Sequence, residues 1–226
     1  MNTKNNFCII GYGNHTKSKI LPALLKINNK KIYIVSDKQV EKNNRIFVFK
    51  NIDNAISKLN KNILFILVTP PNSHYMILKK LLINGFSVLV EKPILLYTYQ
   101  NKNLRKIIKN NFYYECFMHK YNNIYKYLEK YFKKNNKEID LININFLIPK
   151  LKYTSFRDLN QNKGTIINDM ACYAISLINE FNIKIKYVKI LRIKNKLRNN
   201  KENIKILLNS SNFNIILNIG YSSEYK

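Results

Sequence analysis

Short apolar runs alternate with helix-like segments through the first half of the chain, and this alternation constrains the fold most. The strand-like runs are "FCIIG", "KIYIVS", "RIFVF", "ILFILVT" and "FSVLV". Helical spacing of apolar residues is predicted at about 16–27, 52–59 and 72–84, with Pro22 kinking the first helix. Strands that alternate with helices form a parallel sheet covered on both faces. The sequence therefore predicts a doubly wound α/β domain.

The pattern changes near the middle of the chain. A helix at about 98–110 and a strand at 112–118 complete the first domain, predicted as residues 1–118. The remainder, residues 119–226, combines two helices with one long strand and three closing strand candidates. Strands in series favour an α+β domain with an open, mostly antiparallel sheet.

Composition limits the class of protein. The 226 residues are 46% hydrophobic, enough for one large or two small cores. No apolar run approaches the ~20 residues that span a bilayer, and the N-terminal apolar segment is too short for a signal peptide. The three cysteines are far apart, which predicts no disulfide framework and no metal cluster. We expect a cytoplasmic protein that binds no metal and no membrane.

The formal net charge of +26 raises the alternative of nucleic-acid binding. Only five of the 39 basic residues are Arg, the side chain suited to bidentate phosphate and base contacts. The lysines are spread among Asn and Ile along the whole chain. We therefore expect no nucleic-acid partner; the alternative predicts a steeply salt-dependent affinity for any duplex.

A glycine-containing loop, "GYGNHT", follows the first strand and precedes a helix. Gly11 allows a tight turn, and Gly13 lets the backbone approach a pyrophosphate at the helix N-terminus, beside Asn14 and His15. Thr16 stands where the fingerprint has Gly or Ala. The alternative is an ordinary turn, but the position at the first strand–helix junction favours dinucleotide binding.

The end of the second strand commonly selects between the two nicotinamide dinucleotides. An acid there binds the ribose 2′-OH of NAD, whereas a small residue with nearby cations accepts the 2′-phosphate of NADP. Asp37 favours the hydroxyl, and Ser36 with Lys38 favours the phosphate. The cofactor is predicted as NAD or NADP.

Two further strand ends carry functional groups, "VTPPNSH" and "VEKP". Ligands of open α/β sheets lie beyond the carboxyl ends of the strands, so charged residues there can face a ligand. The alternative for Glu91 and Lys92 is a surface ion pair of little energetic value. The remaining candidate cofactor-binding residues at these ends are Thr69, Pro70, Asn72 and His74.

Three segments resemble landmarks of the Gfo/Idh/MocA family: "GYGNHTKSKILPAL", "VTPPNSHYMILKKLLINGFSVLVEKPI" and "GTIINDMACYAISLINEF". The resemblance implies an NAD(P)-dependent oxidoreductase that acts on a sugar, a sugar nucleotide or a related polyol. It places Lys92 beside the nicotinamide and the reacting oxygen. It also implies that the C-terminal sheet forms a homo-oligomer interface.

The third segment resembles the subgroup of glucose–fructose oxidoreductase, xylose dehydrogenase and sugar-nucleotide 3-ketoreductases, in which tyrosine replaces a histidine. Asp169 and Tyr173 are four residues apart and share a helix face. The resemblance makes Tyr173 the proton donor or acceptor, with Lys92 lowering its pKa and Asp169 orienting Lys92 or a hydroxyl. The alternative is that Tyr173 is an aromatic residue of the core.

Departures from the family qualify this interpretation. Ala171 replaces a usual glycine and Lys120 a usual arginine. The chain ends at "IGYSSEYK", where relatives continue through further strands, so the second domain is expected to be incomplete. The alternative function is a catalytically impaired relative that binds the dinucleotide as a sensor or partner subunit.

Overall fold

The computed structural model describes residues 6–41, 43–95, 97–108, 111–148, 167–194 and 202–221. The chain divides into two compact units, Met1–Cys116 and Phe117–Lys226. Sequence periodicity placed the domain boundary between residues 118 and 119. Each unit has its own sheet and its own hydrophobic core.

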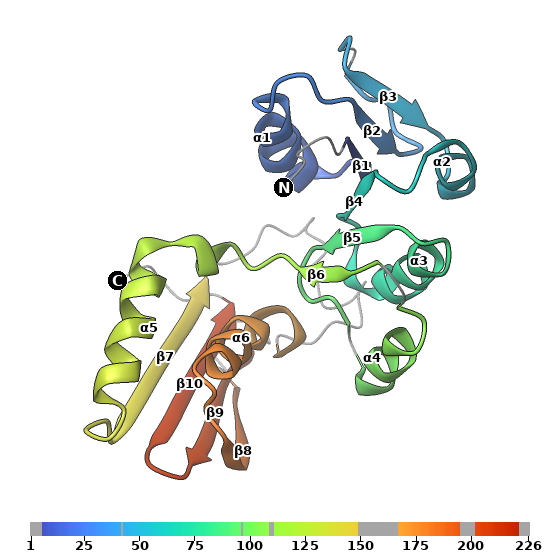
Figure 1. Ribbon diagram of the computed structural model, residues 1–226. Helices are drawn as coiled ribbons and strands as arrows, with labels where there is room; N and C mark the ends of the chain where they lie inside the picture. The colour runs from blue at the N-terminus through green and yellow to red at the C-terminus, as the bar shows by residue number, and fades with distance from the viewer. Residues whose placement is uncertain are drawn as a thin grey trace. The chain divides into compact units, whose positions relative to one another are not determined.

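The first unit is built on a six-stranded sheet with the order β3-β2-β1-β4-β5-β6 (Figure 1). All of its paired strands are parallel. The strands are β1 (Phe7–Ile10), β2 (Ile32–Val35), β3 (Ile46–Phe49), β4 (Leu64–Leu67), β5 (Ser87–Val90) and β6 (Tyr113–Glu115). The order reverses between β1 and β4, which is the switch point of a Rossmann fold. The predicted doubly wound domain is confirmed.

Apolar cores lie on both faces of this sheet. Successive residues of β1 face opposite ways, so Cys8 packs in one core cluster and Ile9 in the other. The helical elements are η1 (Thr16–Ile20), α1 (Leu21–Leu25), α2 (Ile52–Lys58), α3 (Pro71–Ile83) and α4 (Thr98–Arg105). The predicted irregularity near Pro22 takes the form of a π-helical turn, η1, just before it.

Gly85 ends helix α3 as its position in the sequence predicts. It has φ +80°, and the amide of Phe86 donates to the Leu81 carbonyl at 3.1 Å. This is the Schellman pattern, in which glycine adopts the left-handed conformation after the helix. The turn sends the chain directly into β5.

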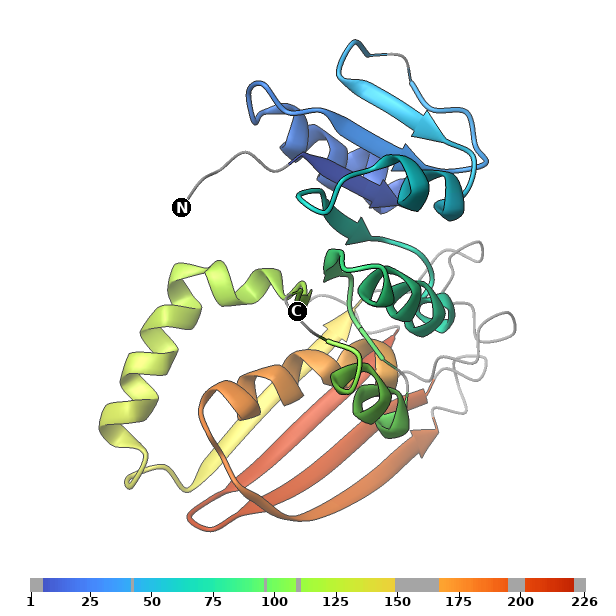
Figure 2. The same cartoon turned by 45° about the vertical axis from the view of Figure 1, so that its right-hand side comes forward.

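The second unit contains a four-stranded mixed sheet with the order β7-β10-β9-β8 (Figure 2). Strand β10 pairs with β7 in parallel and with β9 antiparallel, and β9 pairs with β8 antiparallel. The strands are β7 (Leu141–Ile148), β8 (Ile185–Lys194), β9 (Glu202–Ser210) and β10 (Asn214–Tyr221). The predicted open, mostly antiparallel sheet is confirmed.

Helices α5 (Asn123–Asn135) and α6 (Cys172–Glu180) cover one face of this second sheet. Phe132 of α5 and Ile178 of α6 share a core cluster with Ile206 and Leu217 of the strands. A short 3₁₀ helix, η2 (Met118–Tyr121), precedes α5, and a π-helical turn, η3 (Ile167–Ala171), leads into α6. Strand β7 alternates exposed and half-buried residues, as expected when one face is covered.

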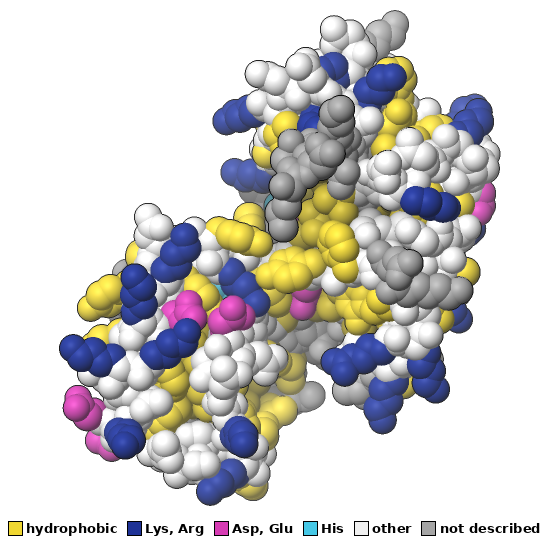
Figure 3. Space-filling view, in the orientation of Figure 1, with side chains coloured by type: hydrophobic (Ala, Val, Ile, Leu, Met, Phe, Trp, Pro, Cys, Tyr) yellow, Lys and Arg dark blue, Asp and Glu magenta, His cyan; other side chains and the backbone are white. Residues whose placement is uncertain are grey.

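Lysine and arginine side chains are distributed over both units on the face in Figure 3, with uncharged side chains between most of them. This distribution matches the spread of lysine along the sequence. Within the described ranges, no helix has the length and apolarity needed to cross a membrane.

Candidate functional site

Gly11 occupies a position that only glycine can fill without strain. Its φ is +103°, and a Cβ there would lie 2.6 Å from the Val68 carbonyl oxygen. Its amide donates to the Val35 carbonyl at 3.1 Å. The turn after β1 is thereby packed between the ends of β2 and β4, at the switch point of the sheet.

Gly13, by contrast, faces open space, and a Cβ built on it would meet nothing within 4 Å. The helix begins immediately afterwards, with the Lys17 amide donating to the Gly13 carbonyl at 3.1 Å. The amides of the first helical turn have no partner within the helix, and the positive end of the helix dipole lies there. Open space before such a terminus fits a pyrophosphate, so the residues present suit a dinucleotide.

Thr16 explains how the fingerprint tolerates the loss of its third glycine. Its side chain is fully buried, and Oγ1 donates to the Gly11 carbonyl at 2.8 Å. The buried hydroxyl thus has its hydrogen-bond partner within the loop. Threonine stabilises the turn through this bond, which a glycine at the same position could not make. The first helical turn is otherwise exposed at Asn14 and half-buried at His15.

The end of β2 lies beside this loop because of the bond between Gly11 and Val35. Ser36 is half-buried, and its Oγ accepts from the Lys38 amide at 3.0 Å. Asp37 and Lys38 are both exposed. The carboxylate, suited to a ribose 2′-OH, and the ammonium, suited to a 2′-phosphate, are thus both available at this strand end.

The end of β4 leads into helix α3 through two prolines. Pro71 is the first residue of α3, where the missing amide hydrogen is not needed. Ser73 Oγ lies 2.6 Å from Thr69 Oγ1, which fixes the threonine at the start of the helix. Pro70 and Asn72 are exposed at the same end.

His74 lies below this surface and has no exposed area. Its Nδ1 is 2.9 Å from the Pro93 carbonyl oxygen, and its Nε2 is 2.8 Å from that of Thr69. Burial lowers the pKa of His74, against the opposing effect of the two carbonyls and Glu91. The ring has no exposed area with which to contact a cofactor, so its burial does not fit the cofactor contact expected from the sequence.

The end of β5 carries Glu91 and Lys92, both half-buried, before a cis peptide bond to Pro93. Glu91 Oε1 lies 3.2 Å from His15 Nε2. The glycine loop and this strand end, 76 residues apart in sequence, are therefore in contact. Lys92 and Glu91 stand at the edge where the parallel strands end, as predicted.

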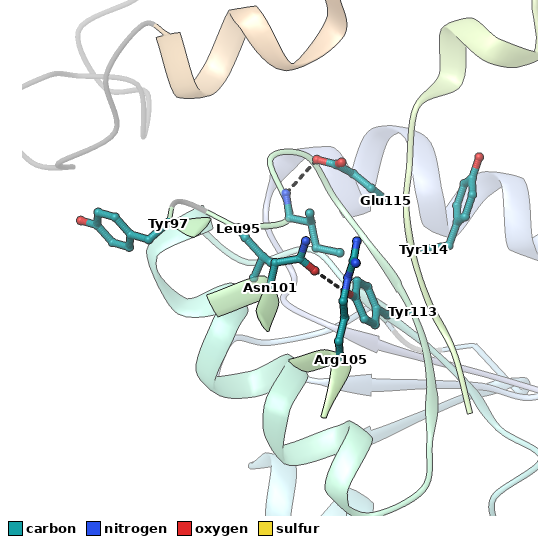
Figure 4. A pocket seen from close by; sticks show the side chains of 8 residues that line it. Leu95, Tyr97, Asn101, Arg105, Tyr113, Tyr114 and Glu115 are labelled. Carbon is teal, nitrogen blue, oxygen red and sulfur yellow. Dashed lines mark hydrogen bonds between the residues drawn. The ribbon is translucent and has the colours of Figure 1, made fainter. Parts of the chain in front are cut away.

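Glu115 was missed as a site residue. At the end of β6 it accepts from the Ile94 amide at 2.9 Å, as the dashed line in Figure 4 shows. The segment "YYECFMHKY" already contained the signal, because it resembles a family segment with glutamate at this position. Sequence alone did not indicate that the carboxylate binds the loop after β5.

A pocket of about 480 Å³ opens beside this loop, between α4 and β6 (Figure 4). Within it the Tyr113 hydroxyl donates to Asn101 Oδ1 at 2.9 Å. Burial raises the pKa of Tyr113, and the hydrogen-bonded Arg105 opposes that rise. The polar groups of the pocket are thus largely engaged with one another.

In the second unit, Tyr173 lies in a group of aromatic rings. Its ring stacks on Phe146 with centroids 4.6 Å apart, and contacts Phe117 at 5.8 Å and His119 at 5.6 Å. The tyrosine is nevertheless only half-buried. Asp169 is buried one helical turn earlier, within the π-helical turn η3. Such turns are frequent at functional sites.

His119 is a titratable neighbour of Tyr173. Burial lowers the pKa of His119, and Lys120 lowers it further, while Glu180 opposes both. Lys120 itself pairs with Glu180 at 2.8 Å. Both ring nitrogens of His119 are buried, and among the residues that the structure describes neither has a hydrogen-bond partner. The lowered pKa favours the neutral form of the imidazole that lies beside the candidate proton donor.

The cysteines are free thiols, and burial raises the pKa of the Cys116 thiol to about 11. Nowhere in the described ranges do three His, Cys, Asp or Glu side chains come together as a metal site.

Residues 5–111 match a family model, GFO_IDH_MocA, described as an oxidoreductase family with an NAD-binding Rossmann fold. This match supports the resemblance to the Gfo/Idh/MocA oxidoreductase family that the sequence motifs indicate. No curated protein matches the chain in sequence. The cofactor expected from the sequence, NAD or NADP, agrees with the family's description.

Solved structures resemble the whole chain. Myo-inositol 2-dehydrogenase from Lactobacillus plantarum matches with a TM-score of 0.81 and 20% identity, covering 97% of this chain and 70% of its own. Scyllo-inositol dehydrogenase from Lactobacillus casei, crystallised with NAD(H) and scyllo-inositol, has a TM-score of 0.79, 20% identity and the same coverage. A mutant 3-ketoreductase from Actinomadura kijaniata, in complex with TDP-benzene and NADP, has a TM-score of 0.81 at 17% identity, covering 98% and 71%. At these identities the likeness establishes the fold of both units.

Proposed function

We propose that this chain is an oxidoreductase that transfers a hydride between NAD or NADP and a sugar, a sugar nucleotide or a related polyol. The observation that carries the proposal is the open space at Gly13, before a helix N-terminus at the switch point of a Rossmann sheet. Lys92 and Glu91 at a neighbouring strand end support it. The similar solved enzymes bind an inositol or a nucleotide-linked ligand, which favours this substrate class.

The bound nicotinamide would supply the hydride chemistry, and the chain's residues would orient the substrate and move its proton. In the oxidation direction, the phenolate of Tyr173 would take the proton of the substrate hydroxyl, while a hydride would pass from the carbon that bears this hydroxyl to the oxidised nicotinamide. Lys92 holds the oxygen and favours the phenolate, because a nearby positive charge lowers a phenol pKa. Asp169 orients Lys92 or a second hydroxyl. The glycine loop, the β2 end and Thr69 hold the dinucleotide.

Nicotinamide fluorescence on titration with NADH and NADPH, followed by turnover with a panel of polyols and sugar nucleotides, tests the proposal. We expect binding of at least one dinucleotide. Lys92→Ala and Tyr173→Phe should lower kcat by roughly 10²–10⁴-fold while keeping that binding. Lys130→Ala and Tyr127→Phe, exposed positions on α5, are matched controls. Binding without turnover over the whole panel would favour the sensor or partner-subunit alternative.

A further inference from the structure

One peptide unit in the loop after β5 is held at both of its ends. The carbonyl oxygen of Pro93 lies 2.9 Å from His74 Nδ1, and the amide of Ile94 donates to Glu115 Oε1 at 2.9 Å. These two groups belong to the same peptide bond. An imidazole from α3 and a carboxylate from β6 therefore bind this peptide unit from opposite sides. Lys92 is the residue that precedes Pro93 in the chain.

These contacts are continuous with the end of β4. The second nitrogen of His74 reaches the Thr69 carbonyl, so the imidazole spans the segments that follow two adjacent parallel strands. Both segments carry candidate cofactor-binding residues. Because a neutral imidazole has one N–H, the tautomer with its hydrogen on Nδ1 donates to the Pro93 carbonyl, and Nε2 then faces the Thr69 carbonyl without donating.

The arrangement is also electrostatically matched. A peptide unit is negative at its oxygen and positive at its hydrogen, and here the oxygen meets an imidazole while the hydrogen meets a carboxylate. Hydrogen bonds to a charged acceptor are roughly twice as strong as neutral ones. Only the Ile94–Glu115 contact has a charged acceptor, but the two contacts together restrict rotation of the peptide, and through it the direction in which the Lys92 side chain leaves the backbone.

We propose that His74 and Glu115 are positioning residues that act through the Pro93–Ile94 peptide to aim Lys92. The expected effect on kcat rests on the proposed function, whereas the two contacts to the Pro93–Ile94 peptide do not depend on it. Neither side chain needs to touch substrate or cofactor. The proposal also accounts for a buried histidine at a position where sequence predicted a cofactor contact.

The experiment compares His74→Phe and Glu115→Leu, which remove the donor and the acceptor, with the conservative His74→Gln and Glu115→Gln. Asn111→Leu is the matched control. Asn111 is also buried, and its Nδ2 also bridges two backbone carbonyls, those of Leu82 and Phe86, but at the other end of β6. It should cost stability without moving the loop after β5.

We expect His74→Phe and Glu115→Leu each to shift the Lys92 and Ile94 amide resonances and to lower kcat about tenfold or more. Glu115→Gln keeps an acceptor oxygen and should restore most of kcat. Because both side chains hold one peptide, the double variant should lose little more than the worse single variant. Asn111→Leu should lower the free energy of unfolding without the kcat loss.

Unchanged Lys92 and Ile94 resonances in both variants would overturn the proposal. The proposal would also be overturned if the ratio of the loss of kcat to the loss of unfolding free energy were the same in these variants as in Asn111→Leu. If the unaltered protein binds no dinucleotide, the proposed function fails, yet the amide resonances still decide whether the two side chains hold this segment. If the Phe and Leu variants do not fold, Glu115→Gln still tests the contact. Exchanging a charged acceptor for a neutral one should shift the Ile94 amide resonance even where most of kcat is kept, and an unshifted resonance would overturn the proposal.

Discussion

His15 Nε2 lies 3.2 Å from Glu91 Oε1, and this contact joins the first helical turn after the glycine loop to the end of β5. Strand β4 lies between β1 and β5 in the sheet, so the pair passes over the end of β4. Three segments predicted separately as cofactor-binding therefore share one edge of the sheet. The contact shows that the two loops are neighbours, and it does not by itself show how much it stabilises the fold.

The His15–Glu91 contact should contribute little to stability. The side chains are 41% and 23% exposed, and pairs in contact with water are typically worth about 0.2–1 kcal/mol. A double-mutant cycle with His15→Gln and Glu91→Gln, measured by urea unfolding, should give a coupling energy below about 1 kcal/mol. The coupling should shrink in about 1 M salt. A larger, salt-independent coupling would contradict this view.

Substitution by alanine should destabilise the protein at Gly11 and leave its stability almost unchanged at Gly13. At Gly11 the left-handed φ and the 2.6 Å approach to the Val68 carbonyl both oppose a Cβ, so Gly11→Ala should cost about 3 kcal/mol of unfolding free energy. At Gly13 nothing opposes the methyl group, so Gly13→Ala should leave stability within about 0.5 kcal/mol.

Ligand binding should separate the same two variants further. The Gly13 methyl group would enter the space proposed for the pyrophosphate, so dinucleotide affinity should fall by roughly tenfold, about 1.4 kcal/mol. Fluorescence titration with NADH and NADPH measures this loss in a protein of unaltered stability. Full affinity in Gly13→Ala would argue against a pyrophosphate at this loop.

Tyr12, between the two glycines, carries a hydroxyl that the fold does not use. The residue is 4% exposed, and within the described part of the chain its Oη has no hydrogen-bond partner. Leaving a buried hydroxyl unpaired costs about 1–3 kcal/mol, so Tyr12→Phe should stabilise the protein by about 1 kcal/mol in thermal or urea unfolding. The Lys17 ammonium, 4.9 Å above the ring, keeps its contact in the variant. Destabilisation by Tyr12→Phe would mean that the hydroxyl has a partner in solution.

Local pattern was sufficient to predict the Rossmann sheet. Strands β1 to β5 of the first unit are short, mostly apolar runs, separated by helical periodicity except between β2 and β3. Gly11 and Gly85 mark turns that need a left-handed residue. The fingerprint at Gly11 and Gly13 is local as well. These features could be predicted because each depends on residues within a few positions of one another.

The contacts of His74 and Glu115 could not be predicted in the same way. Each is fixed by a backbone group about 20 residues away, and sequence does not say which carbonyl or amide will lie opposite a buried side chain. The surroundings of Tyr173 are similar, since its ring contacts come from Phe117, His119 and Phe146. Sequence identified the candidate, and tertiary packing determined its environment.

His74, which is buried, and His119, which is half-buried, should make the protein less stable in acid. Burial lowers the pKa of both His74 and His119 in the folded state, whereas an unfolded histidine titrates near 6.5. Between the folded and unfolded values the unfolded chain binds more protons, so protonation favours unfolding there. The stabilisation is complete above about pH 6.5 and is lost as the pH falls toward the lowered folded values.

Urea unfolding at a series of pH values from about 7.5 to 5 measures this loss. His74→Gln and His119→Gln should each flatten the dependence, and the double variant should flatten it most, because each substitution removes one proton-binding group of the unfolded state. For His119 the nearby Lys120 acts in the same direction as burial, and Glu180 against it. Lys120→Gln should therefore weaken the His119 contribution. An acid loss that is the same in all of these variants would place its origin in other groups.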